Sequence, residues 1–209
     1  MNDRRKRSSV YTMFSTLLQY PDRPTHKEVL ERKPSEIWGQ LAVTHKNGTQ
    51  LPAIPTSWDS DSFMSYEEWL DVYKKAMPPV RAPLQAIESV HKIWSSDPSC
   101  EMPFKNQKGL LHGDAAHHLL AVYHEIGFEV PKSFADSPDH LVLELEFMGL
   151  LAEEADVATQ LTFLEQHLDW VPSLIVDAQA KKAPELYIDL LRWIESFLEL
   201  ERTRLAVKA

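Results

Sequence analysis

The sequence predicts an all-α protein that folds as a single globular helical bundle. The chain of 209 residues contains only 6 glycines, whereas β-proteins with many tight turns usually need more. Apolar residues recur along most of the chain at intervals of three and four residues, which is the spacing of one helix face. A composition of 44% hydrophobic residues is ample for a sizeable core. We assign Trp38, Trp69 and Trp193 to that core.

The N-terminal part of the chain holds three predicted helices. The first covers residues 8–20, where an apolar stripe runs up to Pro21. The second covers residues 36–41, and Ser35 directly before it has the side chain of a helix N-cap. The third covers residues 63–73 and ends before a pair of prolines.

Two irregular segments interrupt these helices. Residues 45–59 contain asparagine, glycine and two prolines and are therefore predicted to be a loop. Residues 78–112 are rich in proline and polar residues, which predicts a hinge or linker. The hinge would join an N-terminal helical part, residues 8–77, to a C-terminal helical part, residues 113–205, within one domain of 209 residues.

The C-terminal part shows clearer helix signals. Asp114 is predicted to cap a helix over about residues 115–126, which a glycine follows. Ser137 is predicted to cap the next helix, with Pro138 in its first turn, and that helix continues to about residue 155.

Two further apolar segments complete the predicted bundle. One lies within residues 161–170 and contains leucines, a phenylalanine and a tryptophan at helical spacing. The other begins at Pro184 and continues to about Leu205 with a regular apolar face.

Charge is distributed unevenly along the chain, whose formal net charge is −9. The 48 residues between Lys132 and Lys181 contain no lysine or arginine and include ten carboxylates. This acidic run is either a solvated face or a surface that attracts a basic partner segment. The basic residues 4–7 are too few to indicate nucleic-acid binding in an acidic protein, and we expect them to be frayed.

The sequence indicates a cytoplasmic protein. Cys100 is the only cysteine, so no internal disulfide can form and a reducing compartment fits. No run of 18 apolar residues occurs, and we therefore expect no stable membrane insertion. The basic start is not followed by a small-residue cleavage site, which argues against a secretory signal.

Residues 139–148 form the most unusual segment, because apolar side chains would cover almost the whole circumference of a helix there. Such a helix belongs in the middle of a bundle. Glu144 shares its side with apolar neighbours, and it needs either a donor within this chain or a ligand. Glu146 aligns with Asp139 and Glu153, seven residues away on either side, in a stripe that is either a solvent edge or a binding surface.

Several segments of the chain resemble, in order and spacing, the signature of the TorD/DmsD/NarJ family of redox-enzyme maturation chaperones. They are Glu88-Ser89-Val90; Gly113-Asp114 before a helix that ends in Gly127-Phe128; Pro138-Asp139-His140-Leu141; Glu144-Leu145-Glu146-Phe147-Met148 with Leu150-Leu151; Phe163-Leu164-Glu165-Gln166-His167-Leu168 with Trp170 and Pro172; and Tyr187 at the start of the last apolar helix. The similarity covers about residues 8–205 and is closest to the branch that serves molybdoenzymes of the dimethyl-sulfoxide-reductase superfamily.

The resemblance implies a TorD-like helical fold and a chaperone without catalytic activity. Such a chaperone binds the precursor of a molybdopterin enzyme, through its twin-arginine signal peptide or its apo catalytic subunit. It assists cofactor insertion and delays export. The resemblance implies no cofactor of its own beyond weak guanine-nucleotide binding, and either a monomer or a homodimer. In the family, the Asp-His pair that matches Asp139 and His140 is implicated in ligand binding.

A twin-arginine signal presents two guanidinium groups followed by an apolar stretch, so its receptor needs carboxylates and an apolar groove. We therefore place the peptide-binding site at Asp139, His140, Glu144 and Glu146. The predicted walls of this site are Glu88, Trp94, Tyr123, His167 and Trp170. His140 either titrates near neutral pH and changes the charge of the site, or is a helix-start histidine bonded to a loop.

Two alternatives remain from the sequence alone. A metal-dependent hydrolase would use the cluster between His112 and His124. The side chains concerned are His112, Asp114, His117, His118 and His124. No HExxH motif, glycine-rich phosphate loop or nucleophile elbow accompanies them. The other alternative is a helical scaffold or nucleotide-sensing adaptor that has no peptide client.

Overall fold

The computed structural model describes residues 2–32, 34–42, 51–58, 63–78 and 81–208. Over these residues the secondary structure is α-helix, with short 3₁₀ turns and one isolated β-bridge but no strand, so the predicted all-α fold is confirmed. The helices are α1 (Asp3–Leu18), α2 (Arg23–Arg32), α3 (Pro34–Ala42), α4 (Tyr66–Ala76), α5 (Glu88–His91), α6 (Asp114–Ile126), α7 (Leu141–Glu154), α8 (Val157–His167), α9 (Val171–Ala180) and α10 (Glu185–Ala206).

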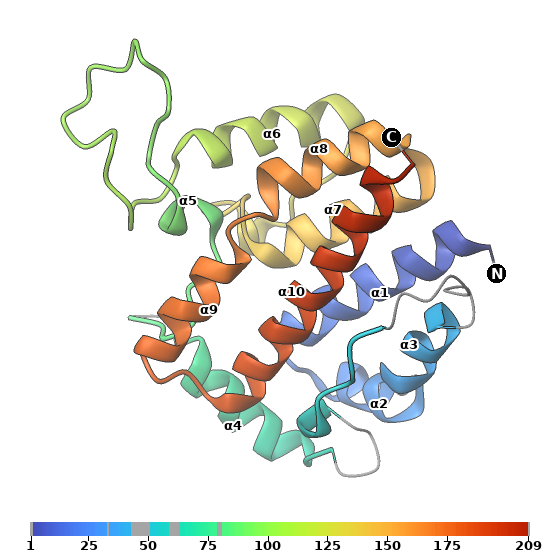
Figure 1. The fold of residues 1–209 in the computed structure, drawn as a ribbon. Coiled ribbons are helices and arrows are strands. Elements are labelled where there is room, and N and C mark those ends of the chain that lie inside the picture. The colour runs from blue at the N-terminus through green and yellow to red at the C-terminus, as the bar shows by residue number, and fades with distance from the viewer. Residues whose placement is uncertain (1, 33, 43–50, 59–62, 79–80, 209) are drawn as a thin grey trace.

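Helix α7 lies in the middle of the bundle, and α1 packs along it over most of its length (Figure 1). On another side α7 contacts α8, which in turn packs against the long C-terminal helix α10. Helices α2, α3 and α4 lie at one end of the molecule, and α6 and α8 lie at the other. The segment between α5 and α6 extends away from the helices.

The burial of α7 confirms the prediction that this helix is enclosed. Between Leu141 and Ala152, only Glu146 and Leu150 are exposed. Gly149 allows the close approach of α1, because a Cβ atom at this position would lie 3.3 Å from Cβ of Tyr11. A larger side chain there would separate the two helices.

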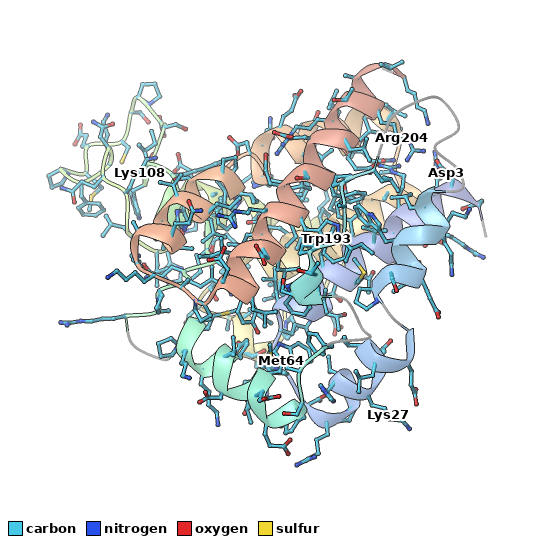
Figure 2. All side chains as sticks on the ribbon, turned by 60° about the horizontal axis from the view of Figure 1, so that its bottom comes forward. Asp3, Lys27, Met64, Lys108, Trp193 and Arg204 are labelled. Atoms are coloured by element: carbon cyan, nitrogen blue, oxygen red, sulfur yellow. The ribbon has the colours of Figure 1, made fainter. Side chains whose placement is uncertain are left out.

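An aromatic cluster joins α1, α3 and α10. The rings of Phe14, Trp38 and Trp193 meet edge to face, with centroids 5.0–6.1 Å apart. Figure 2 shows Trp193 in the interior of the molecule. Trp69 is also fully buried, and its indole N–H donates to the hydroxyl of Tyr187 on α10. All three tryptophans assigned to the core are therefore confirmed.

The N-terminus differs from the prediction of a frayed basic segment. Helix α1 begins at Asp3, and the side chain of Asn2 caps it. Arg7 is buried and forms an ion pair with buried Glu201 of α10 at 2.5 Å. Arg204 pairs with Asp3 nearby (Figure 2). Arg7 is held by Glu201 of α10, and Arg4 and Arg5 are bonded to Glu153 of α7, which the local sequence does not reveal.

Three predicted helix caps were wrong. Ser35 lies inside α3, which already begins at Pro34. Asp114 is the first residue of α6 and Gly113 is its N-cap, because the Asp114 carboxylate accepts hydrogen bonds from Ser95 and Ser96 instead. His140, rather than Ser137, caps α7.

Two other helix ends agree with the sequence, and three helices were missed: α2, α9 and the short α5. Gly127 ends α6 in the left-handed conformation with φ 76°, and α10 begins directly after Pro184. Helix α2 escaped prediction because it has little apolar periodicity, and Val29 is its buried hydrophobic side chain. Helix α9 was missed because Pro172 in its first turn resembles a helix break.

The predicted loop at residues 45–59 falls partly outside the described residues. Its described part, residues 51–58, contains no α-helix and ends in a 3₁₀ turn at Thr56–Trp58. The hinge predicted at residues 78–112 stays a prediction. Within that segment the structure has the short helix α5 and a protruding loop that follows it.

The protruding loop between α5 and α6 is closed at its base. The backbone N–H groups of Trp94 and Ser95 donate to the carbonyls of Gln107 and Lys105. The N–H of Asp114 donates to the carbonyl of Trp94 at 2.8 Å. At Gly113 a Cβ atom would lie 2.6 Å from that carbonyl oxygen, so only glycine allows this closure.

Among the described helices, none is long and apolar enough to cross a membrane.

We expect Arg7→Met to lower the free energy of unfolding by about 3 kcal/mol, because it leaves the buried Glu201 carboxylate without its main cation. Urea unfolding at pH 7 measures the change. Arg5→Met is the matched control, since Arg5 pairs with Glu153 at the surface and its loss should cost less than about 1 kcal/mol. Equal losses in the two variants would contradict a special role for the buried pair.

Candidate functional site

The start of α7 is tied to α5 by a short antiparallel contact. Ile87 and His140 form an isolated β-bridge, and the N–H of Glu88 donates to the carbonyl of Asp139. The carboxylate of Asp139 accepts a hydrogen bond from the N–H of Ser89 at 2.8 Å. This contact joins two segments that lie about fifty residues apart in sequence. It thereby fixes where the side chain of Glu88 points.

The position of Asp139 corrects the predicted acidic stripe. Asp139 precedes α7 and is only 1% exposed, so it does not align with Glu146 on a helix surface. Glu146 is exposed, and Glu153, one heptad further, pairs with Arg5 at 3.0 Å. The stripe is therefore limited to Glu146 and Glu153.

Glu88 is the centre of a polar cluster, although its side chain is 0% exposed. Its Oε2 lies 2.9 Å from Nδ1 of His167, and its Oε1 lies 2.8 Å from Nζ of Lys92. Nε2 of His167 lies 2.7 Å from Nδ1 of His118, and these two imidazole rings are stacked. The cluster leads from a buried carboxylate to the exposed His118.

Lys92 connects Glu88 with the segment that follows α8. Its Nζ lies 2.5 Å from the carboxylate of Asp169 and donates to the carbonyl of Gln166 at 2.7 Å. The neighbouring negative charges, with Glu88 foremost, outweigh the effect of burial and raise the pKa of Lys92. Lys92 is therefore a charged ammonium group in this cluster.

Glu144 lies behind Glu88 and is also 0% exposed. The indole N–H of Trp170 donates to its Oε2 at 3.0 Å, so the donor is one of the chain's own side chains. Burial, and then the negative charges of Glu88 and Asp139, raise the pKa of Glu144 well above its usual range. Among the described residues Glu144 has no cation beside it, so it holds a proton more readily than an ordinary glutamic acid does.

Tyr123 packs beside this acid and is buried as well. Burial, followed by the charge of Glu144, raises the pKa of Tyr123. Its ring contacts Phe147 and Phe128, and its hydroxyl has no hydrogen-bond partner among the described residues. Tyr123 therefore supports the cluster from inside α6 and does not form an exposed wall.

His140 does not titrate near neutral pH, contrary to one of the two expectations. Its Nδ1 accepts a hydrogen bond from the N–H of Val142 at 3.2 Å, and its ring packs against Phe134. Burial lowers the pKa of His140 to about 4. His140 is thus a neutral helix-start histidine, as the other expectation held, although it bonds to the helix itself.

A cavity of about 280 Å³ opens beside Glu88, between α5, α6 and the end of α8. Its lining residues are Glu88, Lys92, Ile93, Ser96, Asp114, Ala115, His118, Gln166 and His167. Of the predicted site residues, Glu88 and His167 border this cavity. The other buried members, Asp139 and Glu144, lie behind it. Trp94 packs on Phe104 within the protruding loop instead.

Sequence reasoning missed Lys92 as part of the site. The signal was present, because Glu88 and Lys92 are four residues apart and such pairs meet on one face of a helix. His118 was assigned to a different hypothesis, the metal cluster. Its contact with His167 joins α6 to α8, and nothing in the local sequence of either helix predicts it.

A larger cavity of about 630 Å³ lies between α1, α2 and α3. It borders none of the predicted site residues, and its walls include serines and threonines of α1. Helix α3, which forms one wall, leads into residues 43–50, which are outside the described residues. We therefore assign the candidate site to the smaller cavity, which lies beside the polar cluster.

Nothing in the structure supports a metal-dependent hydrolase. Over the part of the chain that the structure describes, no three His, Cys, Asp or Glu side chains lie together as a metal ion would require. Asp114 is bonded to Ser95 and Ser96, and His118 is stacked on His167. His117 and His124 are exposed on α6.

Comparisons with known proteins identify relatives of this chain. The sequence profile of the nitrate reductase delta subunit family matches residues 80–176. Chaperone protein TorD from Shewanella sp. (strain ANA-3) is 22% identical over 90% of each chain. TorD from Vibrio parahaemolyticus is 23% identical over 93% of this chain and 81% of its own. TorD from Photobacterium profundum is 26% identical over 47% of this chain and 51% of its own length.

A solved structure has the same fold. It is a protein from Archaeoglobus fulgidus assigned as a redox enzyme maturation protein, with a TM-score of 0.58 and 18% identity over 92% of this chain and 93% of that one. The curated relatives are named as chaperones, and the solved structure shares the helical fold. The chain is thus similar in sequence to TorD chaperones and to the nitrate reductase delta subunit family, and similar in fold to a redox enzyme maturation protein.

We expect Glu144→Gln to change the free energy of unfolding by less than about 1 kcal/mol, because a neutral amide replaces an acid that holds its proton readily, and the amide still accepts from Trp170. Glu88→Gln should cost about 2–4 kcal/mol, because it removes the charge that pairs with Lys92. Urea unfolding at pH 7 compares the two variants. A larger loss for Glu144→Gln than for Glu88→Gln would show that Glu144 is ionised.

We expect His140 to lower the free energy of unfolding when the pH falls below 6.5. Its pKa is lower in the folded chain, so below pH 6.5 the unfolded state binds a proton that the folded state does not bind until about pH 4. The contribution of His140 to the free energy of unfolding is complete above pH 6.5. It is lost as the pH falls towards 4, and the loss amounts to about 1–3 kcal/mol. Unfolding at pH 7 and pH 5 measures this loss. His140→Asn, which keeps a cap acceptor, should show a smaller loss than the wild type, and an equal loss would contradict the assignment.

Proposed function

We propose that this chaperone acts in the cytoplasm on the precursor of a molybdopterin oxidoreductase. It binds the twin-arginine signal peptide of the precursor, its apo catalytic subunit, or both. Binding assists cofactor insertion and delays export until insertion is complete. Similarity to TorD chaperones over most of the chain supports a maturation role, and the single cysteine fits a reducing compartment. Weak guanine-nucleotide binding and the choice between monomer and homodimer stay predictions.

The observation that carries this proposal is a fully buried carboxyl group, paired with Lys92, that lines an open cavity. Glu88 lines the 280 Å³ cavity and is itself 0% exposed. A carboxylate in such a place attracts a cation strongly, because little water competes for it. All nine predicted site residues, from Glu88 to Trp170, fall within the segment that the family profile matches. A basic peptide segment fits this site.

The two acids behind Glu88 act by positioning it and do not touch the client. Asp139 holds the backbone of Ser89, which sets the direction of the preceding side chain. Glu144 holds its proton more readily than an ordinary glutamic acid, so it competes less with Glu88 for the cation. This division of roles accounts for the buried position of Asp139 next to a site that must bind cations.

Apolar side chains beside the cavity suit the apolar part of a signal peptide. Ile93 lines the cavity and is 42% exposed, and Met102 and Leu111 are similarly exposed on the protruding loop. Burying about 500 Å² of apolar peptide surface would contribute about 12 kcal/mol before costs. Association costs roughly 4–15 kcal/mol, which leaves binding near the micromolar range. A chaperone that must release its client needs affinity of this order.

We expect the full chain to bind a synthetic peptide of two arginines followed by twelve apolar residues with a Kd in the micromolar range or below. Glu88→Gln should weaken binding at least 10-fold, because it removes the carboxylate that meets the cation. Isothermal titration calorimetry at low salt measures both, and circular dichroism establishes that the variant is folded.

Glu125→Gln, which changes an exposed glutamate on α6 outside the cavity, is the matched control and should leave the affinity unchanged. A peptide with two lysines should bind more weakly, because an ammonium group lacks the fork geometry of a guanidinium group. If the chain captures neither the peptide nor an apo molybdopterin subunit, the proposed function is wrong. If Glu88→Gln binds as tightly as the wild type, the site assignment is wrong.

A further inference from the structure

The ammonium group of Lys92 lies in a cradle of three oxygen atoms at the edge of the cavity. These are Oε1 of Glu88 at 2.8 Å, Oδ1 of Asp169 at 2.5 Å and the carbonyl oxygen of Gln166 at 2.7 Å. Two of the three oxygens carry negative charge. The cradle is thus built for one cation with several donors, which describes an arginine as well as a lysine.

The carboxylate at the bottom of the cradle is poorly satisfied by Lys92. Oε1 of Glu88 is buried and has no hydrogen bond of good geometry among the described residues, although the Lys92 ammonium lies within ion-pair distance. The Lys92 side chain is 26% exposed, whereas that of Glu88 is 0% exposed. The lysine therefore sits above the carboxylate with a path to solvent, while the carboxylate cannot move out.

We propose that this cradle is an arginine-binding subsite and that Lys92 occupies it until a basic segment of a second polypeptide displaces it. The inference rests on the proposed function and names the atoms that would receive the client's cation. The planar guanidinium fork has more donors than an ammonium group, and it can bridge Glu88 and Asp169 with directed hydrogen bonds. Lys92 in turn moves its charge into water.

The exchange of Lys92 for an arginine costs little free energy, because the Glu88 carboxylate is paired with a cation before and after it. An empty cradle would leave the buried Glu88 carboxylate unpaired, which is strongly destabilising. With Lys92 in place, the free chaperone keeps the carboxylate paired, and after exchange the arginine does so. The contact of 2.9 Å between Nδ1 of His167 and Oε2 of Glu88 is kept in both states. Binding therefore replaces one cation by another and does not need to create a buried charge.

The neighbouring residues suit an arginine side chain more than a free small cation. Ile93 lines the same cavity next to Lys92 and offers an apolar surface to the methylene groups of an incoming side chain. Asp114 lies on the facing helix α6 and adds negative charge to the cavity. Both features favour a cation that arrives on an aliphatic stem.

Two substitutions of Lys92 test the exchange in opposite directions. Lys92→Met removes the competing cation, so the two-arginine peptide should bind at least 10-fold tighter than to the wild type. Lys92→Arg places a better ligand in the cradle, so the peptide should bind at least 3-fold more weakly. Lys181→Met is the matched control, because Lys181 makes comparable bonds to Gln85 and Asp177 away from the cavity. This variant should bind the two-arginine peptide with the affinity of the wild type.

A small cation provides a readout that does not depend on the client. Methylguanidinium at a few millimolar should raise the Tm of Lys92→Met by several degrees but leave the Tm values of the wild type and Lys181→Met unchanged. If Lys92→Met does not fold, Lys92→Arg carries the test alone through its weaker peptide binding. Circular dichroism before each titration decides which variant is used.

The outcomes separate the two proposals. If the wild type binds the peptide and neither Lys92 variant shifts the affinity, the cradle inference is overturned and the proposed function stands. If neither the peptide nor an apo molybdopterin subunit binds any variant but methylguanidinium stabilises Lys92→Met, the cradle is a cation site and the proposed function is wrong. If the peptide, the apo subunit and methylguanidinium all fail to act on any variant, both proposals are overturned.

Discussion

The packing of α1 against α7 is the constraint on which the rest of the structure depends. Helix α7 is apolar on nearly every side, so it must be surrounded, and Gly149 lets α1 approach closely enough to do this. Once α7 is fixed, so is Asp139 directly before its first turn, and Asp139 holds the backbone of α5. The side chain of Glu88 then has one direction, towards His167 and Lys92. A contact between apolar helices thus determines where a buried charge is placed.

The three buried acids of the site meet the cost of burial in three different ways. Asp139 accepts a hydrogen bond from a backbone N–H, Glu144 holds its proton more readily, and Glu88 pairs with side-chain cations. The first two arrangements are internal and permanent, because neither partner can leave without unfolding. The third relies on a mobile side chain at a cavity. Of these acids, Glu88 is therefore the one whose partner can be exchanged while the fold stays intact.

Periodicity along the chain was enough to predict the helical class and the enclosed position of α7, because its apolar residues cover the whole helix circumference. Helix ends were harder to predict, since the ring of His140 caps α7 and the carboxylate of Asp114 is bonded to Ser95 and Ser96, which leaves Gly113 as the N-cap of α6. The site was predicted in part: Glu88 and His167 border the cavity, but Lys92 and Asp169 meet only after α5 and the end of α8 pack together. The burial of Asp139 depended on the same packing. The ordered N-terminus followed from the pairing of Arg7 with Glu201 and of Asp3 with Arg204, and both partners lie on α10, about two hundred residues away.

The protruding loop between α5 and α6 is closed at its base, at Trp94 and Gly113, and is therefore structurally separate from the helices. Its two stems are joined by backbone hydrogen bonds, so changes at the tip near Met102 are not transmitted to the helices. The tip is a natural place to splice in a fluorophore-bearing sequence or an affinity epitope. A probe installed there would report on events at the neighbouring cavity without altering the scaffold that forms it.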